Sequence, residues 1–213
     1  MTEPGAEPGR GIAARALAAG LMAAGLAVLG AFWLGTRPAP VSAQGADAPG
    51  PYLDIAVAGA AEGRVVIDLA EEAAPAHAAR LIALAEAGEY DGILFHRVID
   101  GFMAQTGDVR FGVAGEDLSR AGTGGSDLPD LPAEFSDIPF ERGTVGMARA
   151  QSPDSANSQF FIMFAPASHL NGAYTAVGRV VEGMDVVDAI RRGSGRSGAV
   201  SEPDRMVSVD VRR

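Results

Sequence analysis

The segment FHRVIDGFMAQTGD, residues 95–108, carries most of the structural and chemical information in this chain. Two β-rich runs are predicted within and beside it, at residues 93–99 and 102–106. Successive side chains of a strand point to opposite faces, so one face of the first run is expected to carry Phe95, Arg97 and Ile99. A single polar group among apolar side chains is unusual for a plain core, and it marks this run as a candidate site.

Two later segments mix apolar and single polar residues in the same way. Met147-Ala148-Arg149 leads to NSQFFI at residues 157–162, and HLNGAY occupies residues 169–174. One surface is expected to carry both donors and apolar side chains: Arg97, Gln105, Phe102, Met103 and Phe161. The pattern predicts an apolar dish with a few fixed donors, which is typical of a small-ligand site.

The rest of the chain from Tyr52 onward predicts six more strands and two helices. The strands are expected at residues 53–57, 64–69, 144–148, 159–164, 176–180 and 206–211. The first helix is predicted over residues 76–87, with Pro75 in its first turn, Gly88 at its end and an apolar face of Ala78, Leu81, Ile82 and Ala85. The second is predicted over residues 184–192, with Gly193 at its end and an apolar face of Val187 and Ile190. Because helices do not alternate with strands, we expect a mainly β protein, a closed eight-stranded antiparallel barrel capped by two α-helices.

Residues 108–132 are the longest stretch without predicted regular structure, and loops of this length are usually functional or mobile. Gly122-Thr123-Gly124-Gly125 superficially suggests a phosphate loop. No Lys-Ser/Thr follows it within a strand–loop–helix unit, so a turn beside the predicted small-ligand site is the preferred interpretation. Nearby acidic residues lack metal-loop spacing and are interpreted as solvated charges: Asp127, Asp130, Glu134 and Asp137.

The composition of the 213-residue chain excludes several classes of protein. With 47% hydrophobic and 21% charged residues, a wholly disordered or collagen-like chain is excluded. The absence of cysteine removes disulfides, thiol nucleophiles and thiolate metal sites, and the absence of lysine removes lysine nucleophiles. A formal net charge of −10 argues against a broad nucleic-acid footprint.

Residues 1–43 are predicted to direct export. Arg10 and Arg15 precede the uncharged residues 16–34, and Val41-Ser42-Ala43 is a small-x-small pattern suited to signal-peptidase cleavage. We therefore expect either a signal peptide cleaved after Ala43 or a membrane anchor formed by residues 16–34. In both cases a linker at residues 44–51 and one domain at residues 52–213 are expected in the periplasm, soluble in the first case and anchored in the second.

FHRVIDGFMAQTGD and MARAQSPDSANSQFFIMF, residues 147–164, are long and specific, and they resemble the cyclophilin family of peptidyl-prolyl cis-trans isomerases, especially its bacterial members. The resemblance runs from about Leu53 to Val211. It implies a substrate groove on an outer face of the barrel and catalysed rotation about X–Pro bonds without cofactor or metal. The implied partners are proline-containing polypeptides, in this case unfolded exported proteins that the enzyme helps to fold as a chaperone.

Carried over by position, the resemblance implies a role for each site residue. Arg97 corresponds to the catalytic arginine and Gln105 to a substrate-positioning donor. The implied proline pocket is lined by Phe102, Met103, Phe161 and Leu170. The groove would also include Ala148, Arg149, Gln159, His169 and Tyr174.

Three of these positions and one loop depart from the well-studied eukaryotic members. Those members carry Asn at Arg149, Trp at His169 and His at Tyr174. The last two changes recur among bacterial relatives, so activity is expected to persist, with weaker binding of the inhibitor cyclosporin. The loop at residues 109–121 is also longer than the family's usual version, and the resemblance assigns it no role.

The reaction explains why an arginine is needed. Uncatalysed isomerisation of an X–Pro bond takes tens to hundreds of seconds because amide resonance holds the bond planar. In the twisted transition state the proline nitrogen becomes a pyramidal acceptor, and a guanidinium aimed at it stabilises that state more than the planar one. One charge-assisted hydrogen bond contributes ~1.5–3 kcal/mol, or about one to two powers of ten in rate. Arginine suits this role because it stays cationic at any working pH.

The remaining histidines are given structural interpretations. His96 is expected on the strand face opposite Arg97, as a hydrogen-bonded structural residue rather than an acid or base. His77 lies near the start of the first helix and is interpreted as solvated.

A second hypothesis is a module that binds proline segments or acts as a chaperone with negligible turnover. The acidic composition, His169 and the long loop motivate it. Saturable peptide binding with no kinetic effect would favour it over the isomerase. The chain has no heptad seam, so a monomer is expected.

Overall fold

The computed structural model describes residues 50–213. Its strands are β1 (Tyr52–Ala58), β2 (Gly63–Leu69), β3 (Arg97–Ile99), β4 (Met103–Thr106), β5 (Thr144–Met147), β6 (Phe160–Met163), β7 (Ala176–Glu182) and β8 (Arg205–Arg212). Its helices are α2 (Pro75–Glu86), α3 (Met184–Ala189) and the 3₁₀ turns η1 (Leu118–Arg120) and η2 (Ser168–Leu170). The predicted signal or anchor at residues 1–43, and residues 44–49 of the predicted linker, lie outside the described residues. No helix within residues 50–213 combines the length and apolar character that crossing a membrane requires.

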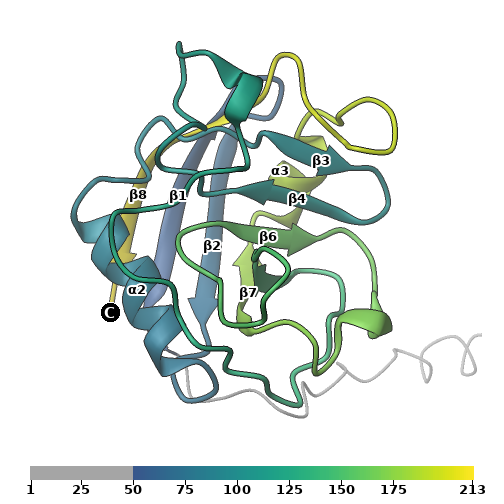
Figure 1. The fold of residues 1–213 in the computed structure, drawn as a ribbon. Helices are drawn as coiled ribbons and strands as arrows, with labels where there is room; N and C mark the ends of the chain where they lie inside the picture. Colours follow the sequence, from purple (N-terminus) through teal and green to yellow (C-terminus); the bar gives the residue numbers. More distant parts are fainter. Residues whose placement is uncertain (1–49) are drawn as a thin grey trace, which may run out of the picture. The chain divides into compact units, whose positions relative to one another are not determined.

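The strands form one antiparallel sheet in the order β3-β4-β6-β5-β7-β2-β1-β8 (Figure 1). The prediction of a mainly β protein with two helices is confirmed, but the sheet is an open, curled half-barrel, so the predicted closed barrel is not. The predicted strand at residues 93–99 is regular only over β3, because Gly92 is left-handed, with a φ of 77°, and the chain remains irregular as far as His96. Isolated backbone hydrogen bonds, such as the one from Phe95 N–H to Asp204 O at 2.9 Å, join this irregular chain to the start of β8.

The side chains of the central strands divide between two hydrophobic clusters. On β6, Phe160 and Ile162 belong to the interior core, which is the cluster enclosed between the sheet and the helices. Phe161 and Met163 belong to the outer cluster, which rests on the other face of the sheet. This separation is the direct result of the two-residue alternation of a strand.

The first helix agrees with its prediction at both ends. Pro75 is at its first turn, and beyond its last residue Gly88 adopts a φ of 71°. The N–H groups of Gly88 and Glu89 donate to the carbonyls of Ala85 and Leu84, each at 2.9 Å, which is the Schellman pattern that terminates helices. The predicted apolar face is buried as expected: Ala78, Leu81, Ile82 and Ala85.

The start of α2 corrects two interpretations. His77 is fully buried rather than solvated, and its Nδ1 lies 2.7 Å from Glu134 Oε2. Glu134 is likewise no solvated charge, because its carboxylate accepts the N–H groups of Ala76 and His77 at 3.1 Å. The residue before the helix, Ala74, has no side chain that could cap it, so a carboxylate from a distant loop fills that role.

The second helix is shorter than predicted. It ends at Ala189, and Ile190 is its C-cap, whereas residues 184–192 with a stop at Gly193 were expected. The chain leaves the helix because Arg191 N–H donates to the buried Asp204 carboxylate at 2.6 Å and Gly193 N–H donates to Val98 O at 2.9 Å. The predicted apolar residues Val187 and Ile190 are nevertheless both buried.

Candidate active site

A row of residues crosses four strands on the outer face of the sheet. Arg97 on β3 is paired in register with Gln105 on β4, Gln105 with Phe161 on β6, and Phe161 with Gly146 on β5. The row therefore runs from a cation through an amide to an aromatic ring. Two candidates predicted from the sequence to share a surface, Arg97 and Gln105, are direct cross-strand neighbours.

The guanidinium of Arg97 is held in place by several contacts. Its Nε–H donates to Ser197 O at 2.9 Å, and its Nη1–H donates to Gln105 Oε1 at 3.1 Å. Met103 Sδ lies 3.9 Å from the same Nη1. Within residues 50–213, no acceptor pairs with Nη2, so this nitrogen retains N–H groups that can donate to a ligand. Partial burial lowers the pKa of Arg97, but an arginine stays cationic at working pH.

A chain of amides fixes Gln105 in turn. Gln105 Nε2 donates to Gln159 Oε1 at 2.9 Å, and Gln159 Nε2 donates to Gly124 O at 2.7 Å. The amide of a glutamine has one end that donates and one that accepts. Because Gly124 O can only accept, Gln159 must donate to it with Nε2, and its Oε1 then accepts from Gln105. The orientation of the cation is thus tied to the position of the glycine-rich loop.

The apolar part of the site is the outer cluster. Its buried members are Met103, Phe140, Phe161, Met163, Ala167, Leu170 and Ala176, and the partly buried side chains packed against it include Phe102, Ala148 and Tyr174. Phe140 and Phe161 stack with ring centroids 5.9 Å apart. A Cβ on Gly146 would lie 2.5 Å from both rings, so this stack requires glycine at residue 146.

The rim of the cluster is aromatic and polar. Phe102 stacks on His169 with centroids 5.9 Å apart and planes inclined by 25°, and Phe161 meets Tyr174 edge to face at 5.9 Å. The guanidinium of Arg149 lies 4.4 Å above the Tyr174 ring. All the residues predicted for the groove therefore gather around the cation or the outer cluster.

Arg149 is more constrained than a free groove residue. Its Nη1 donates to the carbonyls of Ala150 and Gln151 at 3.0 and 3.1 Å, and its Nη2 donates to Ala173 O at 3.1 Å. These bonds join two loops at the edge of the site. The guanidinium thus has a structural task in addition to its charge.

Phe95 and His96 depart from the positions expected of them. Phe95 belongs to the interior core and does not share a face with Arg97 and Ile99, because the chain is irregular before β3. His96 is buried, and the prediction of a hydrogen-bonded histidine is wrong, because among the described residues neither ring nitrogen has a hydrogen-bond partner. Desolvation lowers the pKa of His96 and favours its neutral form.

The sequence analysis missed three contributors to the site. Ser197 supplies a carbonyl to Arg97 from a residue 100 positions away, and Phe140 comes from a loop with no periodic pattern. Asp108 is fully buried and accepts four backbone N–H groups, from Arg110, Phe111, Gly122 and Gly124, at 2.7–3.1 Å. For Asp108, the only signal in the sequence was its place after Gly107 at the end of the segment at residues 95–108. A buried carboxylate needs hydrogen-bond donors, and here backbone N–H groups supply them.

Among the described residues, the geometry offers a fixed cation with donors free at Nη2 beside an apolar cluster with a polar rim. Such a site can hold a small apolar ring and place a positive charge against an atom that gains electron density. The groups just described include no acid/base pair and no activated nucleophile.

Comparisons with known proteins agree on one family. Residues 52–211 match the family described as "Cyclophilin type peptidyl-prolyl cis-trans isomerase/CLD". A probable peptidyl-prolyl cis-trans isomerase of Brucella suis is 57% identical over 153 residues, which are 70% of this chain and 78% of the relative. A peptidyl-prolyl cis-trans isomerase of Synechococcus elongatus is 34% identical over 152 residues, 70% of this chain and 90% of the relative.

Solved structures are similar in fold. The cyclophilin AquaCyp293 from Hirschia baltica has a TM-score of 0.63 and 26% identity, covering 76% of this chain and 74% of its own. A cyclophilin-type isomerase of Cryptosporidium parvum, crystallised in the presence of the dipeptide Ala-Pro, has a TM-score of 0.65 over 76% of this chain and 99% of its own. At 23% identity this second likeness concerns the fold alone.

Proposed function

The chain belongs to the cyclophilin family of peptidyl-prolyl cis-trans isomerases, and from that premise we propose that Arg97 and the outer cluster catalyse rotation about X–Pro bonds in exported proteins. The observation that carries the proposal is a guanidinium whose Nη2 has no acceptor within residues 50–213 and which borders the outer cluster, with Met103 in contact and Phe161 two strands away in the same row. The reaction requires an apolar surface that binds the proline ring and a donor for the proline nitrogen. The outer cluster provides the first, and Arg97 provides the second.

The first part of the mechanism concerns charge. As the amide twists, the proline nitrogen loses conjugation and becomes an acceptor, and Arg97 donates to it only in that state. Ser197 O and Gln105 Oε1 hold the guanidinium in place beforehand, so no reorganisation is needed at the moment of reaction. One such bond contributes ~1.5–3 kcal/mol, or about 10- to 100-fold in rate.

The second part concerns the ring. Phe102, Met103, Phe161 and Leu170 would hold the pyrrolidine ring while the carbonyl side rotates. Gln105, Gln159 and the rim residues Ala148, Arg149, His169 and Tyr174 would position the flanking peptide. Membership of a family of peptidyl-prolyl cis-trans isomerases supports proline-containing peptides as the ligand class.

The biological role follows from the N-terminal sequence. Residues 16–34 and the Val41-Ser42-Ala43 pattern support export to the periplasm, where slow X–Pro isomerisation limits the folding of newly secreted chains. Mass spectrometry of the protein from a periplasmic fraction tests this location. An N-terminus at Gln44 indicates a released enzyme, an intact residue 16–34 segment indicates an anchored one, and recovery in the cytoplasm alone contradicts export.

The activity is tested by isomerisation kinetics on a short X–Pro peptide. The chain is expected to accelerate exchange, and Arg97→Ala is expected to reduce kcat/KM at least tenfold without loss of the folded state by circular dichroism. Arg179→Ala removes an exposed arginine of β7 and is the matched control. An unchanged rate in Arg97→Ala contradicts the mechanism.

The same assay separates the second hypothesis, a proline-binding or chaperone module without turnover. His169 in place of the eukaryotic tryptophan and the long loop at residues 109–121 are the features that favour it. Saturable peptide binding with no acceleration would support the module, whereas catalysed exchange supports the isomerase.

A further inference from the structure

A hollow of about 600 Å³, called here the side hollow, lies beside the proposed proline-binding residues. Its lining shares Gln105, Ala148, Arg149 and Gln159 with the site described above. Gln105 both lines the hollow and accepts a hydrogen bond from Arg97. A single side chain therefore separates the hollow from the proposed catalytic guanidinium. A peptide bound at Arg97 would therefore bring neighbouring residues to its mouth.

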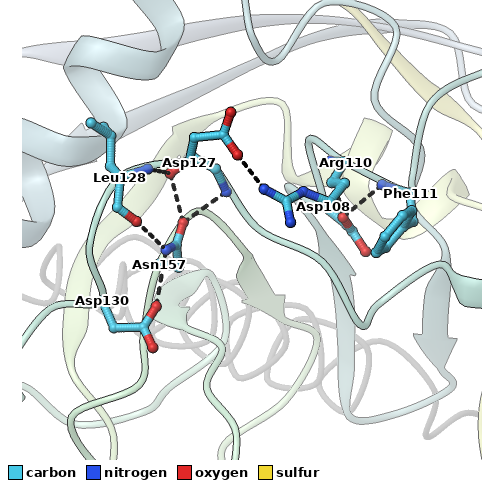
Figure 2. A network of polar contacts seen from close by, with 8 residues as sticks. Asp108, Arg110, Phe111, Asp127, Leu128, Asp130 and Asn157 are labelled. Carbon is cyan, nitrogen blue, oxygen red and sulfur yellow. Dashed lines mark hydrogen bonds and ion pairs between the residues drawn. The ribbon is translucent and has the colours of Figure 1, made fainter.

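The far wall of this side hollow comes from the long loop to which the family resemblance assigns no role. Arg110, Phe111 and Arg120 reach the lining from that loop. Figure 2 shows polar contacts of this loop, in which Asp108 accepts the Phe111 N–H and Asp127 faces the Arg110 guanidinium. The buried Asp108 pins both ends of the loop, so the wall has a fixed position.

The charges of the lining are unbalanced. It contains three arginines, Arg110, Arg120 and Arg149, and one acid, Asp130. Arg110 forms an ion pair with Asp127, and Asp130 accepts a hydrogen bond from Asn157 Nδ2 at 3.0 Å (Figure 2). With Arg110 paired, Arg120 and Arg149 face the single acid Asp130, so the lining keeps an excess of one positive charge in a chain of net charge −10.

Arg120 is the cation best prepared to bind an anion. Its guanidinium lies 3.7 Å above the centroid of the Phe111 ring, a cation–π stack that holds its plane. Within residues 50–213 it forms no ion pair, and its side-chain donors have no hydrogen-bond partner. A guanidinium held flat on a ring keeps its in-plane donors free for bidentate contact with a carboxylate.

We propose that Arg120, supported by Arg149, makes the side hollow a subsite for a carboxylate side chain, so that the enzyme prefers X–Pro bonds with a nearby Glu or Asp. This inference rests on the proposed function and names a substrate class for the same site. The net negative charge of the chain does not oppose it, because charges farther than about 8–10 Å are largely screened at physiological ionic strength.

The reach of a peptide limits where the acidic residue can lie. An extended residue spans about 3.3–3.6 Å, so two or three residues cover about 7–11 Å from the proline. The test therefore moves one Glu through the three positions on each side of X–Pro in an otherwise neutral peptide. At each position a peptide with Gln in place of Glu is the matched neutral control.

The readout is the ratio of kcat/KM for the Glu peptide to that for the Gln peptide. We expect a ratio of about 3 to 10 at one or two adjacent positions on one side of the proline, and a fall toward one when salt is raised. A ratio of one or less at all six positions overturns the inference.

Variants locate the effect. Arg120→Gln is expected to bring the ratio close to one, and Arg120→Lys is expected to restore part of it, because Lys keeps the charge but loses the planar fork. Arg179→Gln removes one charge from the exposed face of β7 and is expected to leave the ratio unchanged. A preference that survives Arg120→Gln, or that falls equally in Arg179→Gln, overturns the assignment to Arg120.

The two proposals fail in different ways. If the Gln peptides are not isomerised at all, the proposed function fails. If the Gln peptides are isomerised and the ratio stays at one, the isomerase proposal stands and the carboxylate subsite is overturned.

Discussion

The two hydrophobic clusters use the same strands and differ in almost everything else. The interior core is built mainly from aliphatic side chains of the strands and of α2, and most of its members are almost fully buried. The outer cluster has aromatic and methionine side chains as its largest members, it includes Phe140 from a loop and Leu170 from η2, and it has a polar rim. Alternate residues of one strand thus serve two different environments.

The comparison suggests how the chain separates stability from activity. A dry cluster of aliphatic side chains stabilises the fold through buried area and close packing. An apolar cluster that is open on one side and fringed by donors has room for a ligand. If this division is correct, substitutions on the two faces of one strand should have different consequences.

The sharpest test of the comparison is the adjacent pair Phe160 and Phe161. Phe160 is 0% exposed and packs edge to face on Tyr90, so Phe160→Ala is expected to lower the free energy of unfolding by about 3–5 kcal/mol. Phe161 borders the open site, where water can fill the space left by the ring. Phe161→Ala is therefore expected to lower the free energy of unfolding by less, but to reduce kcat/KM at least tenfold. Urea unfolding and peptide kinetics measure the two quantities.

The pair Phe160→Leu and Phe161→Leu serves as the control if Phe160→Ala does not fold. The same ranking is expected at smaller amplitude. Equal losses of stability and activity at both positions would break the comparison, because the two faces would then not be functionally distinct.

A smaller effect is expected at Gly146, where the outer cluster touches the sheet. A Cβ there would lie 2.5 Å from the Phe140 and Phe161 rings, and such overpacking costs typically about 1–3 kcal/mol. We expect Gly146→Ala to displace the rings and to raise KM more than it lowers kcat. Val145→Ala, on the interior side of the same strand, is the control and should lower the free energy of unfolding without a rise in KM.

Gln159 tests the connection between the loop and the cation. Gln159→Leu removes the bonds to Gln105 and Gly124, each of which contributes about 0.5–1.5 kcal/mol, or about 2- to 12-fold in an equilibrium or rate. We expect kcat to fall within that range while the thermal unfolding midpoint changes by a few degrees. A kcat equal to that of the unaltered chain would mean that Arg97 is oriented without this relay.

The smallest effect concerns pH and His96, which lies next to Arg97 in the sequence. Burial lowers the pKa of His96 below its value in the unfolded chain. The unfolded state therefore binds a proton first as the pH falls below about 6.5, and stability is lost with a slope of at most about 1.4 kcal/mol per pH unit. Urea unfolding between pH 7 and pH 5 measures this slope.

His96→Leu should have a shallower slope over the same range, because it cannot titrate. The other histidines and the carboxylates remain in both proteins, so the difference between the two slopes isolates His96. Parallel slopes would show that this histidine is protonated in the folded state as readily as in the unfolded state.

Much of the fold could be predicted because it has local causes. The alternation in β6, Pro75 at the start of α2 and Gly88 at its end each act within a few residues. The site residues on β3, β4 and β6 could be named because the segments at residues 95–108 and 147–164 are long enough to identify a family. The same segments carry Arg97 and Gln105, which the register then brings side by side.

The missing parts depend on contacts between distant loops. Ser197 reaches Arg97, and Glu134 reaches His77, across 100 and 57 residues, and neither loop has a periodic pattern. The closed barrel was expected because helices do not alternate with strands, and that argument does not distinguish a closed sheet from an open one. The sequence also did not show that the edge strand β3 is short, because the backbone is irregular between Gly92 and His96. Periodicity reports which way a side chain points in a regular element, and it says nothing about where a loop returns.

The four amides gathered by Asp108 have a further consequence for how this protein can change. Both ends of the loop are held by hydrogen bonds to one carboxylate. The tip at residues 115–121 is therefore anchored through Asp108 and not through strand pairing. Insertions, deletions and new side chains at that tip can be accommodated while the strands of the open sheet keep their register. Sequence changes in this loop can therefore alter the lining of the side hollow without altering the strand pairing that positions Arg97.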